Sequence, residues 1–196
     1  MAPPRKQPKT ESLRIIAGKW RSRRIEFVAA PNLRPTGDRV RETLFNWLAP
    51  CIEGTHCLDL YCGSGVLGFE ALSRGGAGAV LVDANTAVTR AVQSAASQLE
   101  AENCQVLCET SEHYLARSCE RPFNIVFLDP PFRYQRLGQD LEQLHAGGWL
   151  ANDGLVYFEQ AKDDDATPMA EIEAGGWNRV REKETGNIRF GLLKRA

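Results

Sequence analysis

The stretch that decides the fold is CLDLYCGSGVLGFEAL, residues 57–72. An apolar run leads into Gly63, Gly65 and Gly68, which have G-x-G-x-x-G spacing, and a helical pattern of apolar residues follows. Glycines at this spacing allow a tight turn and a close approach of backbone to a ligand. The stretch therefore predicts a strand, a ligand-binding turn and a helix, which form the first unit of an open α/β sheet.

Short apolar runs and longer helical patterns alternate from residue 55 onward. The strand-like runs are HCLDLY, AVLVDAN, CQVLCE, NIVFLDPP and GLVYFEQ. Such β-α-β repetition predicts a parallel sheet with helices on both faces. The tail, WNRVREKETGNIRFGLLKRA, has two strand-like runs around TGN, which indicate an antiparallel hairpin at the sheet edge. We therefore expect an α/β, Rossmann-like fold with about seven strands, most of them parallel.

Three segments are expected along the chain. Residues 1–12 are basic and proline-rich, lead into no apolar signal region, and predict a disordered arm. Residues 13–35 have short apolar stretches around Gly18 and predict a small N-terminal β-hairpin extension. Residues 36–196 are expected to form the main domain, which begins with an amphipathic helix whose cap candidates are Thr36 and Asp38.

Positive charge is concentrated near the N-terminus. Residues 1–47 carry eleven Lys and Arg against four Asp and Glu, a net charge of +7. The remaining residues carry thirteen against twenty-one, a net charge of −8. A basic patch of this kind attracts polyanions through counterion release, but a solvated basic arm without a partner has the same composition. Charge alone leaves both interpretations open.

The composition also limits the location and the redox state of the protein. No apolar run approaches the roughly 20 residues that a membrane helix needs, and 25% charged residues are typical of a globular protein. The six cysteines form no C-x-x-C pair, and several lie within strand-like runs. We interpret them as reduced core thiols and expect a cytoplasmic protein with no metal and no membrane contact.

Two carboxylates narrow the choice of cofactor. Asp83 ends the second strand-like run, where a carboxylate can accept hydrogen bonds from ribose hydroxyls of NAD or of S-adenosylmethionine (SAM). Asp59 lies four residues before Gly63, where it would repel the pyrophosphate of a dinucleotide and attract the ammonium and sulfonium of SAM. Asp59 favours SAM, and an NAD-dependent oxidoreductase is the alternative from another class of enzyme.

A second unusual feature is LDPPF, residues 128–132, at the end of the fourth strand-like run. Strand order in such sheets places this end beside the glycine turn. Pro130 and Pro131 have no N–H groups and form a stiff corner, where the Asp129 carboxylate and the Pro130 carbonyl can accept both N–H groups of an exocyclic amine. Phe132 can stack on the base. The corner predicts a pocket for guanine N2, adenine N6 or cytosine N4.

Such an amine is a poor nucleophile because its lone pair is delocalised into the ring. Two acceptors favour a pyramidal nitrogen, and Asp129 can stabilise the positive charge that develops on it during methyl transfer. Asp129 is expected to orient the amine, and its role as a general base is left open. A non-catalytic RNA-binding protein on a relict fold is a third hypothesis, which predicts that Asp129→Ala changes no activity.

These motifs resemble the class I SAM-dependent methyltransferases that act on exocyclic amines, in which [DNS]-P-P-[FYW] is the catalytic motif. RIIAGKWRSRRI, LRPTGDRVRETLFNWL, GSGVLGFEALSRG and DPPF occur in the order found in the bacterial 16S rRNA guanine-N2 methyltransferase family. This resemblance covers most of the chain. It implies methyl transfer from SAM to guanine N2 in 16S rRNA, free or within a small-subunit assembly particle, by a protein that we expect to be a monomer.

The resemblance also implies roles for individual residues. The expected catalytic residues are Asp129, Pro130, Pro131 and Phe132. The expected SAM contacts are Asp59, Tyr61, Cys62, Gly63, Ser64, Gly65, Asp83, Thr110 and Ser111. The expected RNA contacts are Arg21, Arg23, Arg24, Arg34, Thr36, Arg39 and Arg41. The chain departs from the family at Tyr61-Cys62, where Phe-Ala is usual, and at Thr110-Ser111, where an Asn or Asp commonly faces the adenine.

Overall fold

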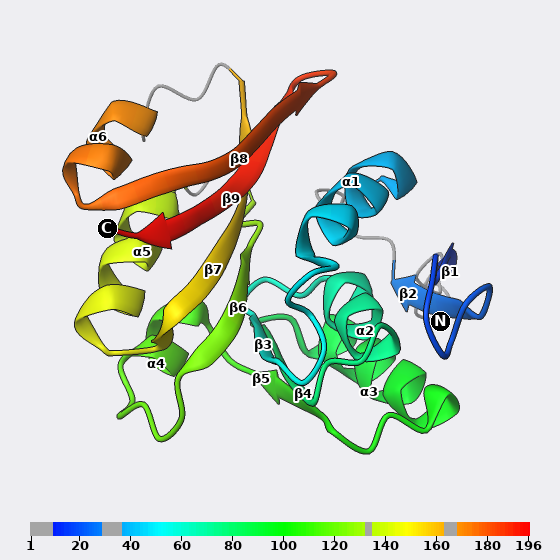
Figure 1. The fold of residues 1–196 in the computed structure, drawn as a ribbon. Helices are drawn as coiled ribbons and strands as arrows, with labels where there is room; N and C mark the ends of the chain where they lie inside the picture. Colours follow the sequence, from blue (N-terminus) through cyan, green and yellow to red (C-terminus); the bar gives the residue numbers. More distant parts are fainter. Residues whose placement is uncertain (1–9, 29–36, 132–134, 163–167) are drawn as a thin grey trace, which may run out of the picture.

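The computed structural model describes residues 10–28, 37–131, 135–162 and 168–196. Its main feature is a seven-stranded sheet in the order β5-β4-β3-β6-β7-β9-β8 (Figure 1). The strands are β3 (His56–Asp59), β4 (Gly78–Asp83), β5 (Cys104–Cys108), β6 (Phe123–Leu128), β7 (Leu150–Ala161), β8 (Trp177–Thr185) and β9 (Ile188–Arg195). The strands from β5 to β7 pair in parallel, and β9 and β8 form an antiparallel edge hairpin. The predicted sheet is confirmed.

Helices cover both faces of this sheet, as the β-α-β pattern predicts. They are α1 (Asp38–Leu48), α2 (Val66–Ser73), α3 (Thr86–Leu99), α4 (Ser111–Leu115), α5 (Leu137–Ala146) and α6 (Met169–Ala174). Figure 1 shows α1, α2 and α3 on one side and α4, α5 and α6 on the other. Within the described part of the chain, none of them has the length and apolarity to cross a membrane.

The sheet separates two hydrophobic cores. Because successive side chains of a strand point to opposite faces, Phe127 and Tyr157 belong to the core on the α1–α3 side, whereas Val126 and Phe158 belong to the core on the other side. This alternation continues to the carboxyl ends of the strands. It therefore decides which of the polar residues at those ends face one another.

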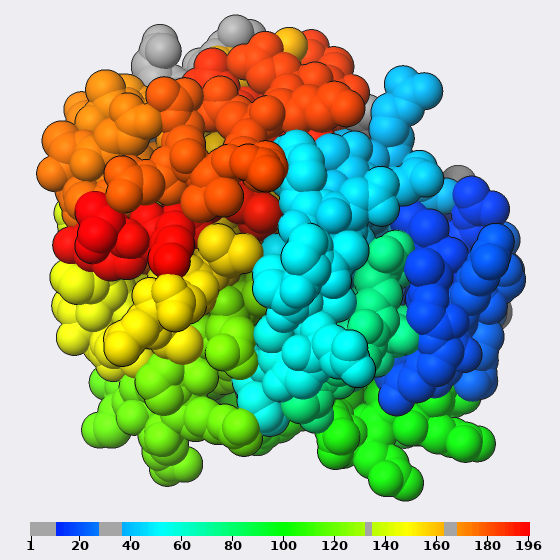
Figure 2. All heavy atoms as spheres, in the orientation of Figure 1, coloured from blue at the N-terminus to red at the C-terminus, as the bar shows by residue number. Residues whose placement is uncertain are grey.

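The N-terminal extension is a separate two-stranded antiparallel sheet of β1 (Thr10–Arg14) and β2 (Arg24–Val28). This confirms the predicted hairpin. Strand β1 begins at Thr10, so residues 10–12, predicted to belong to the disordered arm, are part of the hairpin. Trp20 packs edge-on against Phe69 of α2, with ring centroids 6.5 Å apart. Figure 2 shows the hairpin, in blue, against α1 and α2.

One glycine allows this close approach. Gly18 has a φ of +83°, and a Cβ there would lie 1.8 Å from the carbonyl oxygen of Ser73 at the end of α2. The same carbonyl accepts a hydrogen bond of 2.8 Å from the N–H of Lys19. Only glycine fits here, because any side chain would push the hairpin away from α2.

Helix α1 begins differently from the prediction. Its N-cap is Gly37, which has no side chain to cap the helix, and Asp38 is the first helical residue. The Asp38 carboxylate instead accepts hydrogen bonds from Arg14 at 3.0 Å and Arg41 at 2.6 Å. The expectation that Asp38 caps the helix is therefore wrong, and Thr36 lies outside the described residues.

Candidate active site

The glycine turn joins β3 to α2 as predicted. Cys62 donates its N–H to the carbonyl of Val82 on β4 at 3.0 Å, and Gly65 donates to the carbonyl of Cys62 at 2.7 Å. Gly63 and Gly65 have φ values of +50° and +73°, in the left-handed region that disfavours other residues. A Cβ on Gly65 would also lie 2.8 Å from the ring of Phe69. Both conformation and space therefore require glycine at position 65.

Asp59, the last residue of β3, is buried beneath this turn. Its side chain is only 2% exposed, and its Oδ2 atom has no hydrogen-bond partner among the described residues. Burial raises the pKa of Asp59 to about 7, although backbone N–H groups of Gly68 and Tyr61 partly oppose the rise, and the charge of Asp83 adds to it. A buried carboxylate oxygen without a partner fits a cationic ligand and repels an anionic one.

Asp83, the last residue of β4, braces the turn from the neighbouring strand. Its Oδ2 accepts the N–H of Gly63 at 3.1 Å, and its Oδ1 accepts the N–H of Asn85 at 2.8 Å. Burial raises the pKa of Asp83, and these two hydrogen bonds oppose the rise. Each carboxylate oxygen has more than one acceptor site. The same carboxylate can therefore hold the turn and accept a ribose hydroxyl.

The Asp129 corner lies beside the turn. Strands β3 and β6 are paired, with Asp59 opposite Phe127, and the N–H of Leu60 donates to the Phe127 carbonyl at 3.2 Å. Asp129 is two residues beyond Phe127 and so lies on the same face of the sheet as Asp59. Asp129 is half-buried and Pro130 is buried. The structure thus brings the predicted acceptor corner and the predicted cofactor turn together.

Pro131 is half-buried and directly follows this corner. Phe132, the fourth residue of the predicted catalytic motif, lies outside the described residues. Its stacking on the base stays a prediction.

A network of side chains that the sequence did not reveal joins three loops at this end of the sheet. The Tyr61 hydroxyl lies 2.7 Å from the Ser111 Oγ and donates to the Asp140 Oδ2 at 2.6 Å. Arg136 bridges Asp140, at 3.4 Å, and Glu112, at 2.9 Å. Burial, and then the charge of Asp140, raise the pKa of Tyr61. The network holds the glycine turn against the loops that precede α4 and α5.

The other residues predicted to contact SAM lie at the same end of the sheet. Cys62 and Ser64 are buried within the turn. Thr110 is exposed and caps α4, because its hydroxyl accepts the N–H of His113 at 3.2 Å. Ser111 is buried and follows it as the first residue of α4. Their contacts with a cofactor stay predictions.

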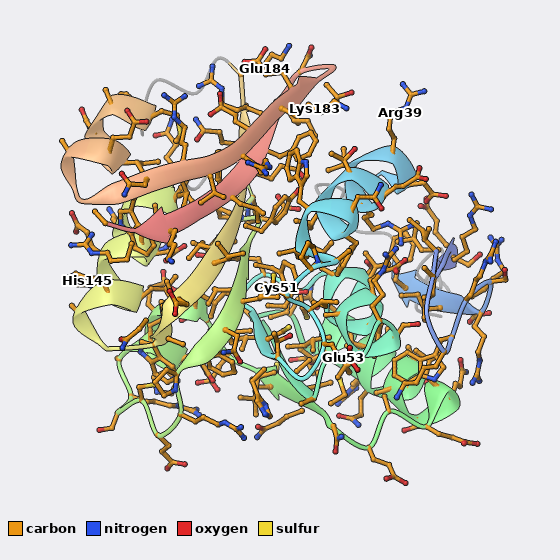
Figure 3. All side chains as sticks on the ribbon, viewed as in Figure 1. Arg39, Cys51, Glu53, His145, Lys183 and Glu184 are labelled. Atoms are coloured by element: carbon orange, nitrogen blue, oxygen red, sulfur yellow. The ribbon has the colours of Figure 1, made fainter. Side chains whose placement is uncertain are left out.

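The predicted RNA contacts fall into two groups. Arg21, Arg23 and Arg24 are exposed on the hairpin, where Arg23 donates to the Gln98 carbonyl on α3. Arg39 is exposed on α1, and Figure 3 shows its side chain projecting away from the sheet. Arg34 and Thr36 lie outside the described residues.

Arg41 is not on the surface of the protein. Its side chain is 0% exposed and forms ion pairs with Asp38 at 2.6 Å and with the fully buried Glu70 at 3.1 Å. The Glu70 carboxylate also accepts the N–H of Ile16 from the hairpin at 2.5 Å. The expected RNA contact of Arg41 is therefore wrong, because its guanidinium is used inside the protein to join α1, α2 and the hairpin.

One acidic residue near the corner was missed. Glu159, near the end of β7, is only 7% exposed, and its Oε2 accepts the Tyr157 hydroxyl at 2.9 Å. Strand β7 pairs with β6, so Glu159 lies beside Asp129. The sequence contains a signal for it, since Glu159 ends the apolar run GLVYFEQ as Asp59 and Asp83 end theirs.

A doubly wound sheet with a glycine turn, a buried carboxylate that has one oxygen without a partner among the described residues, and an acceptor corner on the adjacent strand together define a class I methyltransferase. The comparisons with known proteins agree with this class. Residues 13–194 match the family model described as "Conserved hypothetical protein 95". The chain therefore belongs to this family.

Named relatives are similar over almost their whole length. "Ribosomal RNA small subunit methyltransferase D" of Escherichia coli strain K12 is 42% identical over 183 residues, 93% of this chain and 90% of that protein. The protein of the same name from Haemophilus influenzae is 39% identical over 93% of each chain. The solved structure of a putative methyltransferase from Escherichia coli has a TM-score of 0.82 at 42% identity and covers 94% of this chain and 98% of its own.

Proposed function

We propose that the protein transfers a methyl group from SAM to the exocyclic N2 amine of a guanine in 16S rRNA. The main support for this proposal is the pairing of β3 with β6, because it brings the end of β3, where Asp59 Oδ2 has no partner among the described residues, next to the end of β6, which leads into Asp129. The names of the relatives support small-subunit rRNA as the substrate. The choice of N2 rests on the family resemblance of the motifs.

The turn residues fit SAM. Asp59 can pair with its ammonium group, and Asp83 can accept hydrogen bonds from its ribose hydroxyls. Thr110 and Ser111 lie at the end of the next strand, where the adenine is expected. Bound SAM supplies an electrophilic methyl group on a sulfonium.

The corner residues prepare the acceptor. The Asp129 carboxylate and the Pro130 carbonyl each accept one N–H of the amine and thereby orient the nitrogen lone pair. Asp129 also stabilises the positive charge that develops on the nitrogen in the transition state. Because Asp129 is half-buried, this charge is stabilised in a site where little water competes.

The rRNA is expected to bind through phosphate contacts. Arg21 and Arg24 on the hairpin and Arg39 on α1 are exposed and supply positive charge. The target base enters the corner as a flipped nucleotide. The proposal includes a cytoplasmic monomer that uses no metal. In the part of the chain that the structure describes, no group of three or more His, Cys, Asp or Glu residues could hold a metal ion.

The test is to incubate the protein with labelled SAM and unmodified small-subunit rRNA, both free and in assembled particles, and to analyse the digested nucleosides. Label in N2-methylguanosine supports the proposal. Label in N6-methyladenosine or N4-methylcytidine favours the alternative amines. Micromolar affinity for NAD(H) without affinity for SAM would instead favour the oxidoreductase.

A further inference from the structure

Three acidic residues lie at the carboxyl ends of three adjacent strands. They are Asp59 on β3, Asp129 directly after β6, and Glu159 on β7. The proposed function uses the first two and gives no role to the third. A buried carboxylate next to a catalytic one is costly, because two like charges in a poorly solvated site repel each other.

Glu159 faces the same side of the sheet as Asp129. Strands β6 and β7 pair with Phe127 opposite Tyr157 and Leu128 opposite Phe158, so Asp129 and Glu159 are the next residues in register. Neighbouring strands are about 4.8 Å apart. Burial, and then the charges of Glu159 and Asp129, raise the pKa of Tyr157.

The Glu159 carboxylate is held in a fixed orientation. Its Oε2 accepts the Tyr157 hydroxyl at 2.9 Å, and the Tyr157 ring packs between Phe127 and Phe190, with centroids 6.3 and 6.5 Å away. A carboxylate has about four acceptor sites, so it can accept hydrogen bonds from several donors at once. Glu159 can therefore serve as a positioned acceptor toward a ligand at the corner.

We propose that Glu159 determines specificity by accepting the N1–H of the target guanine. This inference rests on the proposed function and extends it. On the edge of guanine, N1–H is the neighbour of the N2 amine. The Asp129 carboxylate and the Pro130 carbonyl take the two amine hydrogens, which leaves N1–H without a partner. A donor that is buried without a partner destabilises the complex, and Glu159 is the next carboxylate along the sheet.

The same carboxylate excludes the other two amines. In adenine and cytosine the ring nitrogen next to the amine carries a lone pair and no hydrogen. Facing Glu159, this lone pair would meet a carboxylate, so that two acceptors would be forced together in a buried site. The Asp129 corner recognises an aromatic amine of any kind, and Glu159 selects guanine among the three.

The test uses small-subunit rRNA that carries 2-aminopurine in place of the methylated guanine. This base has the same 2-amine, but its N1 carries a lone pair. The wild-type protein is expected to prefer guanine by at least about 100-fold in kcat/KM, because a site built to bind a donor rejects an analogue that lacks it. A wild-type preference below about 10-fold would overturn the inference whatever the variants do.

The deciding variant is Glu159→Gln, which keeps the shape and adds an N–H donor that can face the lone pair of 2-aminopurine. The guanine preference should fall to within about 10-fold, because activity on guanine falls while activity on 2-aminopurine rises. Equal losses on both bases would show that Glu159 has only a structural role. Glu159→Asp, which keeps the charge, should lower the rate but retain a preference for guanine.

Two controls separate this inference from the proposed function. Asp140→Asn changes another buried acid at the same end of the sheet and should leave the ratio of the two bases unchanged, whatever it does to the rate. Thermal unfolding and SAM affinity of each variant establish that it is folded. If wild-type protein forms N2-methylguanosine but Glu159→Gln leaves the ratio unchanged, the inference fails and the proposed function stands. If the wild-type protein methylates another nucleoside instead, both the inference and the proposed function fail.

Discussion

The ionisation of the buried residue Asp59 affects the stability of the whole protein. Its pKa is about 7 in the folded chain, against an ordinary value of 3.8. Between these values the folded protein keeps a proton that the unfolded chain has released, so this group loses its stabilising contribution as the pH rises through that range. At about 1.4 kcal/mol per pH unit between the two pKa values, the unfolding free energy has fallen by roughly 4 kcal/mol at pH 8.

The first prediction follows from this fall in stability as the pH rises. Asp59→Asn should reduce the fall in unfolding free energy between pH 5 and pH 8, measured by urea denaturation of the ligand-free protein. SAM affinity of the wild type should increase with pH up to about 7, because the ionised carboxylate attracts the ammonium group, and the variant should lose this dependence. Asp153→Asn, which changes an exposed carboxylate paired with Lys194, is the control. If unfolding free energy and SAM affinity changed with pH in the same way in wild type and Asp59→Asn, the raised pKa of Asp59 and its role in binding SAM would be contradicted.

Asp129 allows a second prediction at the scale of one residue. Asp129→Asn should lower the single-turnover rate of methyl transfer about 10²–10³-fold, the usual cost of losing one positioned charge-stabilising group. SAM affinity should change by less than about twofold, because Asp129 is expected to hold the amine and not the cofactor. A variant with the wild-type rate of methyl transfer would contradict the role of Asp129 in holding the amine.

The sequence predicted where residues lie when their position depends on local pattern. Asp59 and Asp83 are the last residues of β3 and β4, Asp129 directly follows β6, and parallel strands bring their ends to one edge of the sheet. Arg41 was misinterpreted because its environment depends on Glu70, 29 residues away, and a count of charges does not distinguish buried from exposed ones. The Tyr61–Asp140 contact spans 79 residues and has no sequence signal either.

At the scale of one element, α1 presents two arginines in opposite directions. Arg39 is exposed, whereas Arg41 is buried and paired with Glu70. Arg41→Ala should lower the unfolding free energy by about 3–5 kcal/mol, because it leaves the buried Glu70 carboxylate with one partner fewer. Arg39→Ala should change stability by less than about 0.5 kcal/mol and weaken rRNA binding.

Urea denaturation and rRNA binding at several salt concentrations measure the two effects separately. Glu70→Gln provides a matched test of the buried pair, and it should also loosen the hairpin, because the same carboxylate accepts the N–H of Ile16. An Arg41 variant that keeps full stability and loses rRNA affinity would restore the original interpretation of this residue.

The elements themselves were predicted well because each depends on a short periodic pattern. Most strands of the large sheet coincide with an apolar run, whereas β8 is largely polar and exposed and was indicated by its position before the TGN turn. The start of α1 and the start of β1 were less predictable. Both are decided by contacts between distant segments, such as Asp38 with Arg14, which draw the hairpin and the helix together.

The whole molecule combines a basic extension with an acidic main domain. The hairpin is part of the same hydrophobic core as α2 and α3, since Ile15, Trp20 and Ile25 are buried together with Phe69. Its orientation relative to the catalytic edge is therefore fixed by packing. The charge division in the sequence indicated that the N-terminal part is basic, but the Gly18 contact with Ser73 that fixes the hairpin could not be predicted from local patterns.

The last prediction concerns this basic surface. Changing Arg21, Arg23 and Arg24 together to Gln should weaken rRNA binding and reduce the slope of log K against log salt by up to about one per lost phosphate contact. The matched control changes three arginines of the opposite edge, Arg179, Arg181 and Arg189, of which Arg179 and Arg189 are paired with glutamates. Their loss should leave the slope almost unchanged.

Because Arg23 also donates to α3, its single variant should lower stability slightly, whereas Arg21→Gln should not. If both triple variants reduced the slope equally, binding would depend on net charge alone, and the hairpin would have no special role in rRNA recognition.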